Sequence, residues 1–258
     1  MSTAMTSHER FRRVYAHQEA DRVPVTDVPW DATIERWQRE GMPADAHYAE
    51  FFGLDHVASI HPDNSPRFPE QSIEETDEYL VHTTRWGATE RTWKHAASTP
   101  EHISFTVTDA DSWRAAKARM TPARDRINWD HLARQYPVWR RQGAWINGVL
   151  WFGFDVTHSR VIGTERMLIA MATDPEWCVD MFNHFLDVSI ALLDMVWDAG
   201  YVFDCVTWPD DMGYKYHQFF SLAMYRELLK PVQQRAVEWA HAKGVPAHLH
   251  SCGDINPI

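Results

Sequence analysis

The 258-residue chain is acidic, with 25 lysines and arginines against 36 aspartates and glutamates and a formal net charge of −11. A surface of this sign repels nucleic-acid phosphates and anionic lipid headgroups, and no basic cluster interrupts it. Its 45% hydrophobic, 24% charged and 13% aromatic residues are typical of a folded globular protein. We therefore expect a small-molecule substrate as partner, and neither nucleic acid nor a membrane.

Apolar runs and cysteines bear on the cellular compartment. No run approaches the roughly 20 apolar residues of a membrane-spanning helix, and no apolar signal core follows the first charged residues. Three cysteines at long spacings, Cys178, Cys205 and Cys252, do not resemble a disulfide framework. We expect a cytoplasmic protein with free cysteines.

The first half of the chain alternates between predicted helices and strands and contains one β-rich insertion. A capping box at Thr6–Glu9 begins a helix that continues to about Ala20. Between Ile73 and Lys94, alternating β-branched and aromatic residues around Gly87 predict a hairpin excursion. Further strands are predicted at 25–28 and 56–61, and further helices at 32–40, 44–52 and 109–120.

The second half repeats a strand, a loop and a long helix. Asp174 as N-cap and Pro175 at the first helical position begin the longest helix. This repetition predicts an α/β fold with parallel strands, in a single domain over residues 1–258. The predicted strands are 145–152, 201–208 and 245–250, and the predicted helices are 163–172, 175–199 and 222–243.

The most specific chemical motif is His248-Leu-His250-Ser-Cys252, near the end of the chain. Alternate side chains of an extended strand project from one face, so the two histidines and the cysteine are expected to point the same way. They lie at the carboxyl end of a predicted parallel strand, where α/β proteins place their sites. Imidazole and thiolate are ligands that suit zinc, so zinc is the predicted metal. The alternative is a packed histidine pair and a buried thiol.

Two adjacent carboxylates, Asp210 and Asp211, follow the strand predicted at 201–208. At a strand's carboxyl end they are candidates for general acid and base or for holding a cationic substrate group. A solvated turn with one carboxylate as a cap is the alternative interpretation. Trp208, at the end of the same strand, is a candidate to line a pocket for a planar ligand, or to pack in the core.

The motifs of the chain, taken in their order along the sequence, resemble those of the uroporphyrinogen decarboxylase-like superfamily. The resemblance runs through most of the chain, and the ordered set is more specific than any one motif. It implies a TIM-type (β/α)8 barrel. The matching residues are Asp21-Arg-Val-Pro24, Trp86-Gly87, Asp174-Pro-Glu176, Asp210-Asp-Met-Gly213, Met224-Tyr225, Pro231, Lys243-Gly-Val-Pro246 and His248-Leu-His-Ser-Cys-Gly-Asp254.

Of the two chemistries of that superfamily, the resemblance favours methyl transfer. Its decarboxylases hold substrate carboxylates with an R-Q-A-G-R motif, which is absent here; Thr26-Asp27-Val28-Pro29 stands in that region. Its cobamide-dependent methyltransferases begin their zinc site with His-x-Cys, which His250-Ser251-Cys252 matches. The resemblance thus implies a zinc-dependent methyltransferase that moves a methyl group from a corrinoid, on a carrier protein, to a thiol.

In that interpretation His250 and Cys252 are zinc ligands, His248 is a further candidate ligand, and Asp210 or Asp211 lies near the substrate. One alternative is uroporphyrinogen decarboxylase in porphyrin (heme) biosynthesis, with Asp27, Asp210 or Asp211 stabilising a protonated pyrrole. The other is a non-catalytic protein that binds a tetrapyrrole or corrinoid in an aromatic pocket.

The sequence departs from the superfamily's pattern in two ways. The methyltransferases have a further cysteine ligand well downstream of His-x-Cys, with no counterpart here before Ile258. About five strand units can be counted, whereas a closed barrel needs eight. We therefore expect a barrel that is truncated on its C-terminal side.

Overall fold

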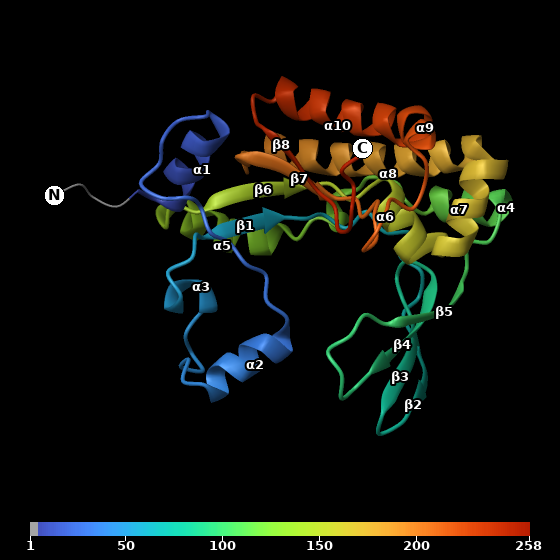
Figure 1. The fold of residues 1–258 in the computed structure, drawn as a ribbon, viewed down its shortest axis with the longest axis horizontal. Helices are drawn as coiled ribbons and strands as arrows, with labels where there is room; N and C mark the ends of the chain where they lie inside the picture. The colour runs from blue at the N-terminus through green and yellow to red at the C-terminus, as the bar shows by residue number, and fades with distance from the viewer. Residues whose placement is uncertain (1–4) are drawn as a thin grey trace.

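The computed structural model describes residues 5–258 and contains a parallel and an antiparallel sheet of four strands each (Figure 1). The predicted α/β fold with parallel strands is confirmed. In the order of the parallel sheet, its strands are β1 (Val57–Ile60), β6 (Trp145–Val149), β7 (Cys205–Pro209) and β8 (Ala247–His250). Those of the antiparallel sheet are β2 (Ser72–Glu75), β3 (Tyr79–Thr83), β4 (Ala88–Trp93) and β5 (Glu101–Phe105).

Helices precede the strands and connect them. No helix within residues 5–258 combines the length and the apolar character needed to cross a bilayer. The α-helices are α1 (Ser7–Tyr15), α2 (Asp31–Arg39), α3 (Tyr48–Phe51), α4 (Ala110–Ala118), α5 (Trp129–Arg141), α6 (Phe154–Val156), α7 (Thr164–Thr173), α8 (Pro175–Asp198), α9 (Leu222–Met224) and α10 (Lys230–Ala242). A 3₁₀ turn, η1 (Arg124–Arg126), and two π-helical segments, η2 (Thr157–Ile162) and η3 (Tyr225–Leu229), complete the set.

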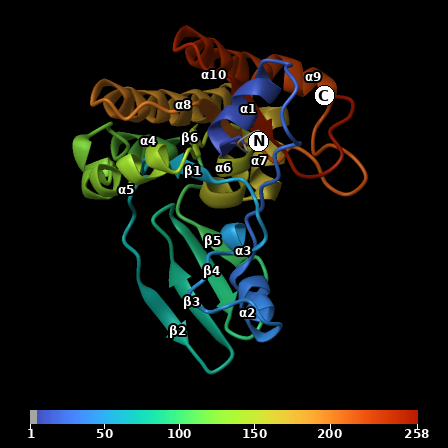
Figure 2. The same ribbon diagram turned by 90° about the vertical axis from the view of Figure 1, so that its left-hand side faces the viewer.

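The parallel sheet has one covered face and one open face, and the register assigns each residue to one of them. The covered face packs against α8 and α10, which lie along it in Figures 1 and 2. Ala58, Ile60, Ile146, Val206 and Trp208 lie on that face. Ser59, Asn147, Val149, Thr207, His248 and His250 lie on the other.

The parallel strands neighbour one another in chain order. Barrels share this order, whereas doubly wound sheets reverse it at a switch point. Within residues 5–258 the sheet is open, with β1 and β8 at its edges.

The prediction of a strand at 25–28 is wrong. In the described part of the chain, this segment is extended but joins neither sheet, and Val28 is 89% exposed. Asp55 donates a backbone hydrogen bond of 2.8 Å to Val25. The β-branched residues favoured a buried strand, but the segment lies on the surface ahead of α2. The count of about five parallel strands therefore becomes four within residues 5–258.

The β-rich insertion is larger than the hairpin predicted at 73–94. β3 and β4 pair around Gly87, whose φ is +90°. A Cβ atom on Gly87 would lie 2.8 Å from the Phe68 ring, so a side chain is excluded there. β2 and β5 extend this hairpin on both sides. The alternation of the apolar Ile103, Phe105 and Val107 with Ser104 and Thr106 is a signal for β5 that the prediction did not use.

The carboxylate of Asp55, just before β1, attaches the N-terminal segment to the sheet. Its side chain is fully buried and is bonded by Arg10, by Arg22 at 2.6 Å and by the Val25 amide at 2.9 Å. Burial alone would raise the pKa of Asp55, but these donors and Ser7 outweigh it and lower that pKa. The ionised form is therefore the one that stabilises the fold.

Asp55→Asn is expected to lower the free energy of unfolding at pH 7 by about 3 kcal/mol, because the buried Arg10 loses a charged partner. The folded-state pKa of Asp55 lies below its unfolded value. Its contribution is thus present above about pH 4 and is lost as the pH falls through the folded-state pKa.

Urea unfolding of wild type and Asp55→Asn at pH 7 and pH 3 measures this contribution, with the exposed Asp45→Asn as control. The difference in unfolding free energy between wild type and Asp55→Asn should be smaller at pH 3 than at pH 7. An equal difference at both pH values would contradict a lowered pKa of Asp55.

Candidate metal centre

Three potential metal ligands meet at the carboxyl ends of β7 and β8. One ligand atom from each of Asp211, His250 and Cys252 lies within 4.8 Å of the others. The Cys252 Sγ is 3.4 Å from the His250 Nε2, which is 3.7 Å from the Asp211 Oδ1. Two neighbouring strand ends thus bring together a thiol, an imidazole and a carboxylate.

The spacing of these atoms fits a tetrahedral metal ion. With metal–ligand bonds of about 2.0 to 2.3 Å, the ligand atoms of a zinc tetrahedron lie about 3.5 Å apart. The separations of 3.4 and 3.7 Å are close to that value. Three ligands leave a fourth position free for water or a substrate. His250 and Cys252 are exposed, so that position is open to solvent.

Hydrogen bonds between the loops after β7 and β8 hold the three side chains together. Each loop contributes donors and acceptors to the other, so the two loops are held against each other. The bonds run from the Asp210 amide to the His250 carbonyl (2.9 Å), from the Met212 amide to the Ser251 Oγ (3.0 Å) and from the Cys252 amide to the Asp211 Oδ1 (2.7 Å).

Two glycines allow these loops to touch. A Cβ atom on Gly253 would lie 2.2 Å from the carbonyl carbon of Gly213, and Gly253 has a φ of +81°. Any other residue at Gly253 would push the loops apart and adopt a strained backbone. Gly253 is therefore part of the geometry of the centre.

Asp210 lies beneath the cluster and is completely buried. Its Oδ1 accepts a hydrogen bond from the Asp155 amide, in the first turn of α6, and its Oδ2 accepts one from Gln233, both at 2.8 Å. Burial raises the pKa of Asp210 to about 7, although these donors oppose the rise. The structure thus gives the two adjacent aspartates different places, since Asp211 belongs to the cluster and Asp210 is buried between α6 and α10.

The segment after β6 brings two further titratable side chains beside the cluster, Asp155 and His158. Burial raises the pKa of Asp155, against a 2.8 Å bond from Trp151, and the charge of Asp211 raises it further. Burial lowers the pKa of His158, in η2, to about 4, so its imidazole is neutral at pH 7. The His158 Nε2 is 3.9 Å from the Asp155 Oδ1. π-Helical segments such as η2 are frequent at functional sites.

Sequence reasoning missed Asp155 and His158, although a signal for them existed. The rule that selected residues after β7 and β8 applies equally to β6, whose apolar run was recognised. Asp155 and His158 are the first acidic and imidazole side chains after that strand.

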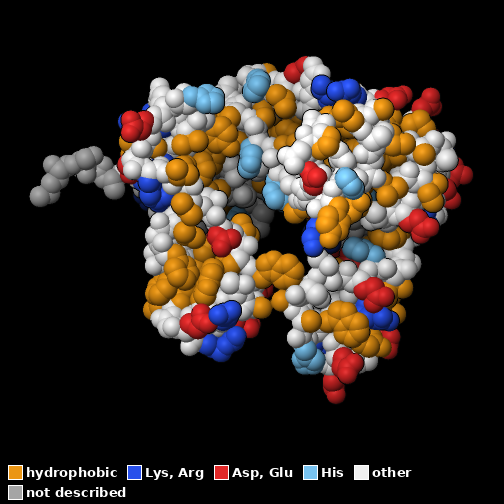
Figure 3. Space-filling model, in the orientation of Figure 1, with side chains coloured by type: hydrophobic (Ala, Val, Ile, Leu, Met, Phe, Trp, Pro, Cys, Tyr) orange, Lys and Arg blue, Asp and Glu red, His pale blue; other side chains and the backbone are white. Residues whose placement is uncertain are grey.

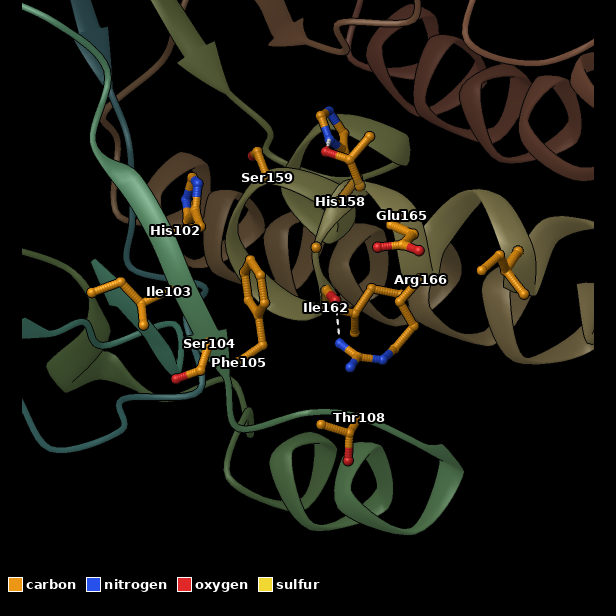
Figure 4. Close-up of a pocket in the computed structure, with 13 residues that line it drawn as sticks. His102, Ile103, Ser104, Phe105, Thr108, His158, Ser159, Ile162, Glu165 and Arg166 are labelled. Carbon is orange, nitrogen blue, oxygen red and sulfur yellow. Dashed lines mark hydrogen bonds between the residues drawn. The ribbon is translucent and has the colours of Figure 1, made fainter. Parts of the chain in front are cut away.

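A groove of about 820 Å³ opens next to His158 (Figure 4). One wall consists of β5 with His102 and Phe105, and the other consists of η2 and α7. Ser159 lines it and donates a 2.6 Å hydrogen bond to the Asp155 carbonyl, so the groove adjoins the segment beside the cluster. The space-filling view shows this face of the molecule hollowed at its centre, with histidines along the upper rim (Figure 3).

His248 shares the open sheet face with His250 but is not a member of the cluster of three. Burial lowers the pKa of His248, and the charge of His250 lowers it further. The face alternation predicted for the two histidines is present. The third ligand atom within reach belongs to Asp211 and comes from the neighbouring loop.

The other two predicted substrate residues lie away from the cluster. Trp208 is on the covered face of the sheet, 2% exposed, with its ring 5.5 Å from that of Phe152. Asp27 lies in the exposed segment before α2, and its carboxylate accepts a 2.8 Å hydrogen bond from the Val28 amide. The structure therefore brings neither side chain to Asp211, His250 or Cys252.

Gly153→Ala is expected to destabilise the protein more than Gly200→Ala. Both glycines have a positive φ, of +87° and +90°, so alanine is strained at either position, and at Gly153 the ψ of −152° adds to that strain. A Cβ atom at Gly153 would lie 2.5 Å from the Asp210 Oδ2, whereas at Gly200 nothing lies within 4 Å. The steric contact and the added backbone strain together should make the loss of unfolding free energy about 1 to 3 kcal/mol larger for Gly153→Ala, as measured by urea unfolding. Equal losses would contradict the contact between Gly153 and Asp210.

No family model matches the sequence, and no curated protein matches it. Among solved structures, the fold is similar to that of a methyltransferase from Methanosarcina mazei, with a TM-score of 0.55 and 15% sequence identity. The similarity covers 98% of this chain and 72% of that chain. At this identity the likeness shows the fold alone, so the chain shares a mixed α/β fold with an archaeal methyltransferase.

Proposed function

We propose that the protein is a zinc-dependent methyltransferase that moves a methyl group from a corrinoid to a thiol. The observation that carries the proposal is the cluster of Asp211, His250 and Cys252 at adjacent strand ends. Imidazole and thiolate are ligands that suit zinc, and the ligand spacing fits a tetrahedron with one position left for a substrate. The fold shared with a methyltransferase agrees with the proposal but is coarser evidence.

Asp211 supplies the third ligand in this proposal. The superfamily resemblance implied a downstream cysteine in that role, but the loop after β7 already places a carboxylate oxygen 3.7 Å from the His250 Nε2. Zinc accepts carboxylate oxygen beside nitrogen and sulfur. In the metal-free protein, burial and then the charge of Asp211 raise the pKa of Cys252, so its thiol loses a proton when a metal binds.

A bound zinc ion would lower the pKa of a coordinated substrate thiol, so that the thiolate exists at neutral pH. The residues of the chain hold and surround that position. His250, Cys252 and Asp211 leave one side of the centre open, and the groove beside His158 offers room for the rest of the thiol substrate. A corrinoid on its carrier protein would approach from the hollowed face.

We also propose that the parallel sheet is part of a (β/α)8 barrel. The chain order of the strands and the placement of α8 and α10 on a single face support it. His248 and His250 lie on the face turned away from these helices, which corresponds to the interior of a barrel.

Metal binding is the first test. Purified protein should bind one zinc ion per chain, and His250→Ala, Cys252→Ser and Asp211→Asn should each weaken binding by more than about 100-fold, since even outer-shell changes cost 10- to 100-fold. Zinc titration against a chromophoric chelator measures this. The controls His248→Ala and Asp254→Asn lie outside the cluster and should keep wild-type affinity. A wild-type protein that binds no zinc would refute the proposal.

Methyl transfer is the second test. With methylcobalamin as donor and a panel of small thiols as acceptors, demethylation of the corrinoid should be followed spectrophotometrically. Removal of zinc by a chelator and Cys252→Ser should each abolish the reaction, because the substrate thiol is then no longer activated. Turnover that persists in both conditions would exclude the proposed role of the cluster.

A further inference from the structure

A line of hydrogen-bonded polar side chains connects the segment between β7 and β8 to the candidate metal centre. Gln233, on α10, is 5% exposed, and its Nε2 donates to the Asp210 Oδ2 at 2.8 Å. Its Oε1 accepts a 3.0 Å hydrogen bond from the hydroxyl of Tyr225, in η3. Both ends of the Gln233 amide are therefore used, and its orientation is determined.

Asp210 transmits this constraint to both ligand loops. Its other carboxylate oxygen accepts from the Asp155 amide, and its own amide donates to the carbonyl of His250. Asp210 also directly precedes Asp211 in the chain. Asp210 thus connects α6 and α10 through its carboxylate, and the two loops of the centre through its backbone.

A glutamine at the buried position 233 costs free energy unless it makes these hydrogen bonds. The buried residues of α10 near it are apolar, namely Val232, Ala236 and Ala240. A buried amide among them costs free energy unless it is fully hydrogen-bonded, whereas an apolar side chain there would need no partner. The next residue, Gln234, is exposed and bonds to Glu238 on its own helix.

We propose that Gln233, oriented by Tyr225, is a positioning residue of the metal centre. It fixes the Asp210 carboxylate, and through it the loops that carry Asp211, His250 and Cys252. This inference rests on the proposed function, because it requires that the cluster binds a divalent metal. Neither Gln233 nor Tyr225 belongs to the cluster of three candidate ligands.

Loss of the amide would leave the buried Oδ2 of Asp210 without that donor. The turn at Asp210 would relax, and the ligand separations of 3.4 and 3.7 Å would no longer be held near the tetrahedral value. Outer-shell changes of this kind lower metal affinity by about 10- to 100-fold. The geometry at the metal should change as well as the affinity.

The experiment compares wild type, Gln233→Leu, Tyr225→Phe and the control Gln234→Leu in the full chain. Zn²⁺ affinity is measured by competition with a chelator, and the visible spectrum of the Co²⁺-loaded protein reports the ligand set and its symmetry. The thermal midpoint of the metal-free protein is measured in parallel. Gln234→Leu makes the same substitution one position along the same helix, on its exposed side.

Gln233→Leu is expected to weaken Zn²⁺ binding about 10- to 100-fold and to alter the Co²⁺ spectrum. Tyr225→Phe, which removes a single hydrogen bond, should weaken binding several-fold. Gln234→Leu should match wild type in both measurements. If Gln233→Leu fails to fold, Tyr225→Phe alone decides, because it retains the packing of the ring.

Other outcomes separate this inference from the proposed function. Variants with a lower metal-free thermal midpoint but wild-type affinity and Co²⁺ spectrum would overturn the positioning role and leave the metal centre intact. Wild-type protein that binds neither metal would overturn the proposed function itself, and the inference with it.

Discussion

The buried carboxylate of Asp210 is the constraint on which the candidate site depends. A carboxylate enclosed by protein is unfavourable unless donors surround it, and here the donors come from α6 and α10. Gly153 leaves the space that the carboxylate occupies. Because these partners follow or connect consecutive parallel strands, satisfying one side chain also fixes how the ends of β6, β7 and β8 lie relative to one another.

Much of this arrangement could be predicted from local sequence signals. The N-cap and proline at Asp174 and Pro175 mark the start of α8, and the apolar runs mark β6 and β7. The rule that parallel strands present chemistry at their carboxyl ends selected the loops after β7 and β8. Strand alternation placed His248 and His250 on one face, as the register has them.

The rest depended on tertiary contacts that no local pattern encodes. Sequence could not tell Asp210 from Asp211, because only the contacts with Gly153, Asp155 and Gln233 decide which carboxylate is enclosed. The segment 25–28 has the residues of a strand, but no neighbouring strand pairs with it in the described chain. Trp208 could have been assigned to the core, because it alternates in phase with Val206.

The positions of the three candidate ligands in the chain also bear on how it folds. The Cys252 amide and the Asp211 carboxylate are 41 positions apart, and the whole crossover through α10 lies between them. Bringing Cys252 and Asp211 together closes a long loop, which costs the unfolded chain conformational entropy. A metal held by both ends would act as a reversible cross-link that closes this loop. Its binding would favour the paired β7–β8 unit over states in which β8 has detached from the edge of the sheet.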